Sequence, residues 1–471
     1  MAKKSEKIEL DKLPEDFVPI VYRLPEPKED IFNEDPNPSF STNIAYPKFS
    51  LGFYHYIHQS KDKMEITKEF EGKKKVYLVF NKFERYIDDY EYDINNSSKV
   101  YFDLSSKPNI LSRAFYKLWE LFFLFDIIPV NSNGFTSAHL AEGPGSFVQA
   151  TMFFRDKFIK KGFSTKNDKY YAITLQPEDN RKHVPEVERT FVEYYSKEKP
   201  VRFTLHRTFN NNISRQSNKK DNGDITKLKT IRLFEDDLGG DKADFITADG
   251  GFEWQNENVQ EQESFKLILS EILTAARIQA KNGNFVCKFF ESFTDVTLAF
   301  IEILESFYTT VFISKPLMSR QSNSEKYLVC LGFLYDNKSK EKQNKIKVLE
   351  DILERMNEEG LNVINIFKNY KKSDQFITTI IRANTEIANR QFKKINEIVD
   401  FIQRQNYRGD EYQKRRDMQI DATKYWIDLF FPAVENFENN KKVCQNLRDQ
   451  ILEKNNNLIK NLQKKINFDS S

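Results

Sequence analysis

The sequence predicts an α/β protein built on a doubly wound sheet, with an N-terminal extension and a helical C-terminal region. Between residues 106 and 338, short apolar runs alternate with longer runs whose apolar residues have helical spacing. This alternation is typical of a largely parallel sheet with helices on both faces. The segment 315–325 between the last two expected strands is too short for a helical crossover, which predicts an antiparallel last strand.

Within this central region the apolar runs predict the following elements in order. We expect strands at 135–141, 169–175, 243–248, 284–289, 309–314 and 326–333, and helices at 110–128, 146–160, 257–281 and 294–307. The stretch 177–222 is rich in Lys, Arg, Asn and Glu and is interpreted as a polar insertion into this domain.

The regions on either side differ from it in composition. Residues 1–105 are interpreted as an N-terminal extension or small subdomain: a proline-bearing arm over 1–50 and strand-like runs at 75–80 and 100–102. Those runs form either a subdomain or edge strands of the main sheet. Residues 339–471 are charged and helical in period, and the apolar run 425–431 is expected to dock on the central domain.

Composition excludes several classes of protein. The 72 basic residues nearly balance the 70 acidic ones, so a nucleic-acid site must be a local basic patch. The three cysteines, Cys287, Cys330 and Cys444, lack metal-ligand spacing, which argues against a zinc site or disulfide framework. Cys287 and Cys330 lie inside apolar runs and are expected to be buried thiols. No secretory signal or membrane span is apparent. We therefore expect a soluble intracellular protein that is not secreted.

The run Ala138 to Phe147 (AHLAEGPGSF) predicts a strand, a tight glycine turn and a helix N-terminus. In doubly wound sheets such turns lie at the carboxyl edge of the strands, where small ligands bind. The turn is not GxGxxG, which disfavours a dinucleotide, and Glu142 stands where it could meet a cationic part of a ligand. The alternative is a structural turn without a ligand. The GxSxG, HExxH and GxxxxGK[ST] patterns do not occur, which disfavours hydrolases, zincins and P-loop enzymes.

Four polar residues lie where a buried site would place them: Lys117, Asp249, Lys288 and Glu325. Lys288 is the most informative, because a lysine inside an apolar strand costs free energy unless it is paired or neutral. Its alternative is an edge-strand lysine that reaches solvent. As a set, the residues would hold two ammonium groups between two carboxylates, and one lysine with a lowered pKa could act as a general base.

These motifs, taken in order, resemble the FtsJ-like family of S-adenosylmethionine-dependent RNA ribose 2′-O-methyltransferases, and most closely the branch that methylates the mRNA cap. The residues that carry the resemblance are 112–118 (SRAFYKL), 140–147 (LAEGPGSF), 223–226 (GDIT), 248–252 (ADGGF), 285–289 (FVCKF) and 315–325 (KPLMSRQSNSE). The resemblance implies a Rossmann-like methyltransferase sheet and covers about 109–335. Ser146 departs from the family, in which many members carry glycine.

The resemblance also implies roles for residues at matching positions. Lys117, Asp249, Lys288 and Glu325 would form the catalytic tetrad. S-adenosylmethionine would be bound by Glu142, Gly143, Pro144, Gly145, Ser146, Phe147, Asp224, Ile225 and Asp249. RNA would be bound by Arg113, Lys315, Arg320 and Asn323. No metal is implied.

Three functions stay open at this point. The leading one is a cap-specific mRNA 2′-O-methyltransferase that acts on the first transcribed nucleotide (cap 1) in mRNA processing. The second is a methyltransferase of the second cap nucleotide, rRNA or tRNA, and the third is a non-catalytic RNA-binding scaffold. The expected partners are capped mRNA and other capping or transcription proteins, bound through the terminal regions. The expected location is the nucleus or cytoplasm, or the viral factory or virion if the protein is viral.

Overall fold

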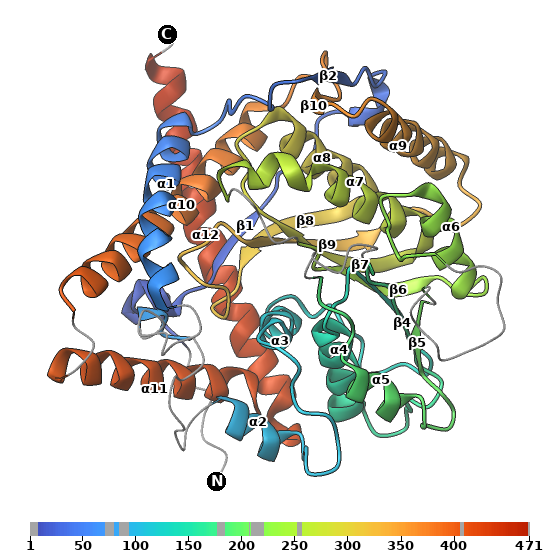
Figure 1. Ribbon diagram of the computed structural model, residues 1–471, viewed down its shortest axis with the longest axis vertical. Coiled ribbons are helices and arrows are strands. Elements are labelled where there is room, and N and C mark those ends of the chain that lie inside the picture. Colours follow the sequence, from blue (N-terminus) through green and yellow to red (C-terminus); the bar gives the residue numbers. More distant parts are fainter. Residues whose placement is uncertain are drawn as a thin grey trace.

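The computed structural model describes residues 8–70, 80–83, 94–176, 184–206, 208, 221–251, 257–405 and 409–469. At the centre of this described part lies an eight-stranded sheet with the order β1-β8-β9-β7-β6-β3-β4-β5 (Figure 1). The strands are β1 (Ile20–Arg23), β3 (Thr136–Leu140), β4 (Lys169–Ala172), β5 (Phe203–Leu205), β6 (Ala243–Ala248), β7 (Gln279–Phe289), β8 (Tyr308–Lys315) and β9 (Lys326–Phe333).

The sheet is doubly wound, as the sequence predicts. Strands β5, β4, β3, β6 and β7 are parallel neighbours. Strand β9 lies antiparallel between β7 and β8, with Lys288 opposite Tyr327, so the predicted antiparallel last strand is confirmed. The carboxyl ends of the parallel strands meet at one edge of the sheet, which is the edge that binds ligands in such folds.

Helices cover both faces of the sheet (Figure 1). The helices are α1 (Leu51–Lys63), α2 (Ile94–Tyr101), α3 (Ala114–Phe125), α4 (Ser146–Phe158), α5 (Arg189–Tyr195), α6 (Leu228–Asp237), α7 (Gln260–Ile278), α8 (Asp295–Phe307), α9 (Lys340–Glu358), α10 (Asp374–Gln403), α11 (Asp410–Phe430) and α12 (Phe437–Asp469). Side chains along a strand alternate between two buried clusters: Phe285 and Cys287 pack with α7 and α8, whereas Val286 packs with α3 and α4.

The described residues of 177–222 belong to the main domain and do not form a separate insertion. It contributes helix α5 and strand β5, and β5 pairs in parallel with β4 at the edge of the main sheet. The three-residue strand is too short to show a period-2 pattern, and its neighbours Arg202 and His206 are polar. The sequence therefore does not predict a strand here.

The N-terminal region also joins the sheet. Strand β1 pairs antiparallel with β8, and β2 (Ser39–Ser41) pairs with β10 (Asn362–Asn365) in a separate two-stranded sheet. The strand expected at 100–102 is wrong, because α2 extends to Tyr101 there; a short apolar run does not distinguish strand from helix. Most of the strand expected at 75–80 lies outside the described residues.

The C-terminal region is helical, as expected. Helix α10 packs on α1, and α12 packs on α3 and β1. The apolar run 425–431 docks on α3: Trp426 is fully buried and lies 5.6 Å from Tyr116, ring centre to ring centre. Dividing the chain at residues 105 and 338 stays a prediction. No helix in the described ranges has the length and apolar character needed to cross a membrane.

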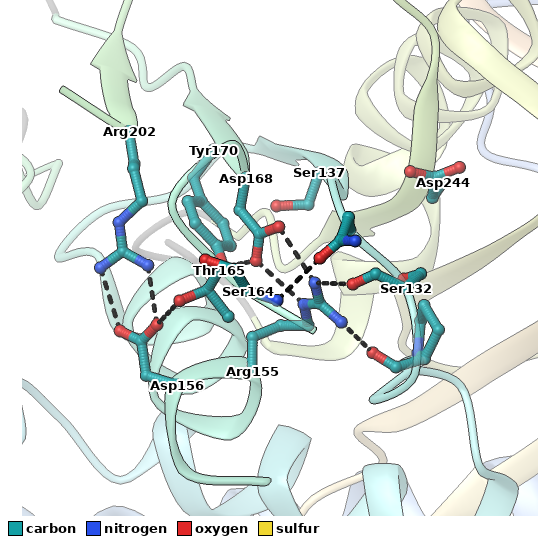
Figure 2. A network of polar contacts seen from close by, with 12 residues as sticks. Ser132, Ser137, Arg155, Asp156, Ser164, Thr165, Asp168, Tyr170, Arg202 and Asp244 are labelled. Atoms are coloured by element: carbon teal, nitrogen blue, oxygen red, sulfur yellow. Dashed lines mark hydrogen bonds and ion pairs between the residues drawn. The ribbon is translucent and has the colours of Figure 1, made fainter. Parts of the chain in front are cut away.

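A buried polar network ties α4 to the sheet (Figure 2). Arg155 Nε and Nη2 donate to the Asp168 carboxylate at 2.9 and 3.0 Å, and the Tyr170 hydroxyl donates to the same carboxylate at 2.9 Å. Arg155 also donates to the backbone oxygens of Pro129 and Ser132. Because these residues lie before or at the beginning of β3 and β4, the network stabilises the edge of the sheet opposite the ligand-binding edge.

Candidate active site

A cavity of about 400 Å³ opens at the carboxyl edge of the sheet. Its walls come from the segments that follow β3, β4 and β6, from Lys288 near the end of β7, and from 223–226, which leads into α6. Of the residues assigned to the cofactor by resemblance, five line it: Gly143, Pro144, Asp224, Ile225 and Asp249. A volume of this size is typical of a site for a small molecule or cofactor.

The Glu142–Phe147 turn is built for close packing. A Cβ atom on Gly143 would lie 1.8 Å from the Pro185 backbone oxygen, so no larger residue fits without a shift. Glu142 lies beneath the turn, where its Oε1 accepts from the N–H groups of Phe147 and Val148 at 2.8 and 2.9 Å. Burial raises the pKa of Glu142 to about 8. Glu142 therefore caps α4 from inside the protein, and it does not line the cavity wall.

The remaining turn residues also act from behind the wall. Gly145 is the N-cap residue of α4 and has a positive φ of 109°, which glycine adopts without strain. The hydroxyls of Ser146 and Ser112 lie 2.7 Å apart, and Ser112 itself lines the cavity. Phe147 is buried 6.0 Å from the Tyr327 ring. Serine at 146, the departure from the family, thus connects the turn to the segment that precedes α3.

Asp249 and Lys288 meet at the cavity. Lys288 Nζ donates to the Asp249 backbone oxygen at 2.9 Å and lies 3.2 Å from its Oδ1. Both side chains contribute to the cavity wall. The alternative of a lysine that reaches solvent at a sheet edge is wrong, because β7 lies inside the sheet between β6 and β9.

Lys117 and Glu325 form the second pair. Lys117 Nζ lies 2.7 Å from Glu325 Oε1 and 2.9 Å from Oε2, although the residues are 208 positions apart. Lys117 projects from α3, and Glu325 immediately precedes β9, one residue before the strand that carries Tyr327 opposite Lys288. The structure therefore brings all four residues of the expected tetrad to one place.

The electrostatics of the tetrad differ from the expectation in one respect. Burial lowers the pKa of Lys288, but attraction by Asp249 and Glu325 outweighs burial and holds that pKa above its ordinary value. The lowered lysine pKa expected from the sequence is therefore not found for Lys288. Burial raises the pKa of Glu325, yet Lys117, Lys288 and Lys315 together hold it well below its usual range. Without ligands, the site is thus a set of charged pairs.

Lys315 and Asn323 do not take the places expected of RNA contacts. Lys315 is buried, and its ammonium donates to Ser319 Oγ, to the backbone and side-chain oxygens of Asn323 and to the Glu325 backbone oxygen, at 2.7–3.2 Å. Burial lowers the pKa of Lys315 to about 7. Lys315 therefore holds together the loop 316–325, and the side-chain oxygen of Asn323 serves this contact. Arg113 and Arg320 line a separate pocket beside the loop.

Three further residues support the tetrad and were missed from the sequence. The Tyr327 hydroxyl donates to Asp249 Oδ1 at 3.2 Å, and the Ser319 hydroxyl donates to Glu325 Oε1 at 2.8 Å. Glu271 on α7 accepts from the Gly250 N–H at 3.2 Å, and burial raises its pKa to about 8. Only the pairing of β7 with β9 signals Tyr327, and pairing is a property of the folded sheet. Phe252 of the 248–252 motif lies outside the described residues.

The side-chain groupings that bind metal ions in proteins combine several His, Cys, Asp or Glu residues. Within the ranges that the structure describes, no three His, Cys, Asp or Glu side chains gather as metal ligands would. The three cysteines are buried and free, and the predicted burial of Cys287 and Cys330 is confirmed. The fold is a doubly wound sheet with a cavity at the carboxyl edge of its parallel strands.

Comparison with known proteins relates this region to one family. Residues 110–333, just under half of the chain, match the family described as FtsJ-like methyltransferase. One similar solved structure, described as a putative ribosomal RNA methyltransferase from Plasmodium falciparum, is 21% identical and covers 47% of this chain and 98% of that one, with a TM-score of 0.31.

Curated relatives carry the name cap-specific mRNA (nucleoside-2′-O-)-methyltransferase 1. The Caenorhabditis elegans protein is 31% identical over 227 residues, which are 44% of this chain and 23% of the relative. The Mus musculus protein is 27% identical over 313 residues, 62% of this chain and 34% of the relative. A Caenorhabditis briggsae relative, 27% identical over 44% of this chain and 25% of its own length, is named as inactive. The match spans about a quarter to a third of each relative.

Proposed function

We propose that this chain transfers a methyl group from S-adenosylmethionine to the ribose 2′-hydroxyl of the first transcribed nucleotide of capped mRNA. The observation that carries the proposal is the meeting of Lys117, Asp249, Lys288 and Glu325, of which Asp249 and Lys288 line the cavity. Similarity alone does not separate active from inactive relatives, since one relative is named inactive. The complete lysine–carboxylate tetrad favours an active enzyme.

The cavity fits the cofactor on physical grounds. The lining carries two carboxylates, Asp224 beside Ile225 and Asp249 beside Lys288. Gly143 packs closely against the Pro185 backbone, where a larger residue would not fit without a shift. When bound, the cofactor would supply an electrophilic methyl group on a cationic sulfur. We infer that Asp224 and Ile225 hold its adenosine part and that the Gly143–Pro144 turn and Asp249 hold its methionine part.

The tetrad can handle the proton of the reacting hydroxyl. Lys288 would accept the proton as the 2′-oxygen bonds to the methyl carbon and the carbon–sulfur bond breaks, leaving S-adenosylhomocysteine. Its pKa is raised by the carboxylates, and a cationic group beside Asp249 would oppose that effect and favour the neutral amine. Lys117 and Glu325, held at 2.7 Å, would orient the ribose.

Methyl transfer to three matched RNAs tests the proposal. The RNAs carry a cap, a cap with the first ribose already 2′-O-methylated, and a bare 5′ triphosphate. We expect transfer to the first RNA alone. In the source cell, we expect the reaction to take place in the nucleus or cytoplasm. Equal transfer to all three would move the function to another RNA, and cofactor binding without transfer would favour a scaffold.

A further inference from the structure

A small basic pocket lies beside the tetrad and is formed largely by segments outside the FtsJ-like domain. Its charged lining residues are Asp16 and Lys82 from the N-terminal region, Arg113 and Arg320 from the domain, and Lys394 from α10. Lys82 and Lys394 lie outside residues 110–333. The lining thus contains four cationic side chains and one carboxylate.

The contacts within the pocket show how this charge is arranged. The Asp16 carboxylate lies 2.9 Å from Lys82 Nζ and 3.9 Å from Lys394 Nζ. Burial raises the pKa of Asp16, but Lys394 and Lys82 outweigh it and hold that pKa below its ordinary value. Lys394 also lies 3.0 Å from Glu397, outside the lining. One carboxylate in the pocket leaves its lining with an excess of positive charge.

The pocket adjoins the reacting groups. Ser319 lies in its wall, and the Ser319 hydroxyl donates to Glu325 Oε1 of the tetrad at 2.8 Å. Arg113 immediately precedes α3, one helical turn before Lys117. The volume of about 20 Å³ has room for about one water-sized group, so it admits a single phosphate oxygen and excludes a nucleobase. Position and charge together match a phosphate that lies close to the reacting ribose and points one oxygen into the pocket.

We propose that Lys82, Arg113, Arg320 and Lys394 bind a backbone phosphate of the substrate RNA next to the methylated nucleotide, with Asp16 weakening that contact. This inference rests on the proposed function and adds that the N-terminal region and α10 are part of the RNA site. Phosphate contacts position the RNA without reading its sequence. They also make affinity depend on salt, because each neutralised phosphate releases counterions.

The test compares variants on two substrates, a capped dinucleotide and a longer capped oligonucleotide, at several salt concentrations. Lys82→Gln and Lys394→Gln are expected to raise KM for the oligonucleotide several-fold. Each should reduce the slope of log KM against log salt by about 0.7, the value for one single-strand phosphate contact. Cofactor affinity and thermal stability are measured alongside. Asp16→Asn is expected to act in the opposite direction and lower KM, which a folding defect cannot imitate.

Lys393→Gln is the matched control, because Lys393 is the neighbour of Lys394 on α10 but is 63% exposed and outside the pocket lining. An equal effect of Lys393→Gln would mean general charge attraction and would overturn the pocket. Unchanged KM and salt slope in Lys82→Gln, Lys394→Gln and Asp16→Asn would also overturn it. Failure of the wild-type chain to methylate either RNA would instead refute the proposed function. The same variants would then be compared by direct binding of the oligonucleotide, where loss of affinity supports the pocket and no change refutes it.

Discussion

The indole Nε1 of Trp426 donates a hydrogen bond to Oε2 of Glu120 at 3.1 Å, across 306 positions of sequence. Glu120 is buried on α3, and it also accepts from the backbone N–H groups of Leu317 at 2.7 Å and Met318 at 3.3 Å. One carboxylate thus joins the C-terminal helix α11 to the loop that carries Glu325. The C-terminal region therefore helps to shape the candidate active site.

Replacing Trp426 by phenylalanine tests this connection. Trp426→Phe keeps an aromatic ring but removes the donor, so we expect a loss of about 1–2 kcal/mol in the free energy of unfolding and slower methyl transfer. Urea unfolding and kcat measure the two effects. Tyr425→Phe is the control, since Tyr425 donates to the Phe17 backbone oxygen instead. Equal kcat in both variants would show that the loop does not depend on this bond.

Removing the Lys288 amine is expected to stop the reaction. Lys288→Met should reduce kcat by at least about 100-fold, the effect of losing a general base, with cofactor affinity retained within a few-fold. Single-turnover methyl transfer and calorimetric cofactor binding measure these quantities. Lys281→Met, at an exposed position of the same strand, should behave as wild type. Retained activity in Lys288→Met would assign the base elsewhere.

Neutralising Glu325 is expected to move the pH profile of the reaction. Attraction by Glu325 raises the pKa of Lys288, so Glu325→Gln should let Lys288 lose its proton at lower pH. The rising limb of the single-turnover rate against pH should therefore shift to lower pH. The maximum rate should also fall, because Lys117 loses its partner. A midpoint at the wild-type pH would mean that the titrating group does not sense Glu325.

His206 is expected to make stability depend on pH. Burial lowers its pKa, but hydrogen bonds to Asp221 and Asp237 outweigh burial and raise it to about 9. The stabilisation of the folded state by protonated His206 is complete at pH values below the unfolded-state pKa of about 6.5. It is lost as pH rises through about 9, with a total of up to about 3 kcal/mol.

Urea unfolding at pH 6 and pH 9 measures this loss. His206→Gln should lose most of the difference between the two pH values. Asp221 also accepts from the Gly223 N–H at 2.9 Å, beside the cavity. Cofactor affinity of the wild type should therefore weaken over the same pH range. A wild-type stability that is flat from pH 6 to 9 would contradict the prediction.

The Arg155–Asp168 pair is expected to stabilise the fold without taking part in the reaction. Asp168→Asn leaves the fully buried guanidinium of Arg155 without its counter-charge and should cost about 3–5 kcal/mol. Asp156→Asn, which breaks the more exposed pair with Arg202 seen in Figure 2, should cost less than about 1 kcal/mol. Thermal unfolding measures both. Below its melting temperature Asp168→Asn should keep its cofactor affinity, and a large loss of affinity there would show that the network supports the site.

Much of the site was accessible from local sequence. The turn at Gly143 and the lysine inside β7 are signals of single segments, because a strand of consecutive apolar residues makes one charged side chain conspicuous. Strand β5 was not accessible, since three residues carry no period. Nor was the burial of Lys315, whose four acceptors belong to a loop that folds back over it.

The sequence by itself determined the doubly wound sheet and its antiparallel last strand, because hydrophobic period and connection length are properties of short stretches of chain. It also supplied the candidate residues of the tetrad, through their places beside the expected strands and through the family resemblance. Only the tertiary structure shows that Lys288 pairs with Asp249 and Lys117 with Glu325. It also shows that Lys315 instead supports the loop 316–325. It also added Tyr327, Glu120 and the Lys82–Lys394 pocket to the surroundings of the tetrad. The physical reason is distance along the chain: ion pairs and burial join residues hundreds of positions apart, and no local pattern encodes which of them meet.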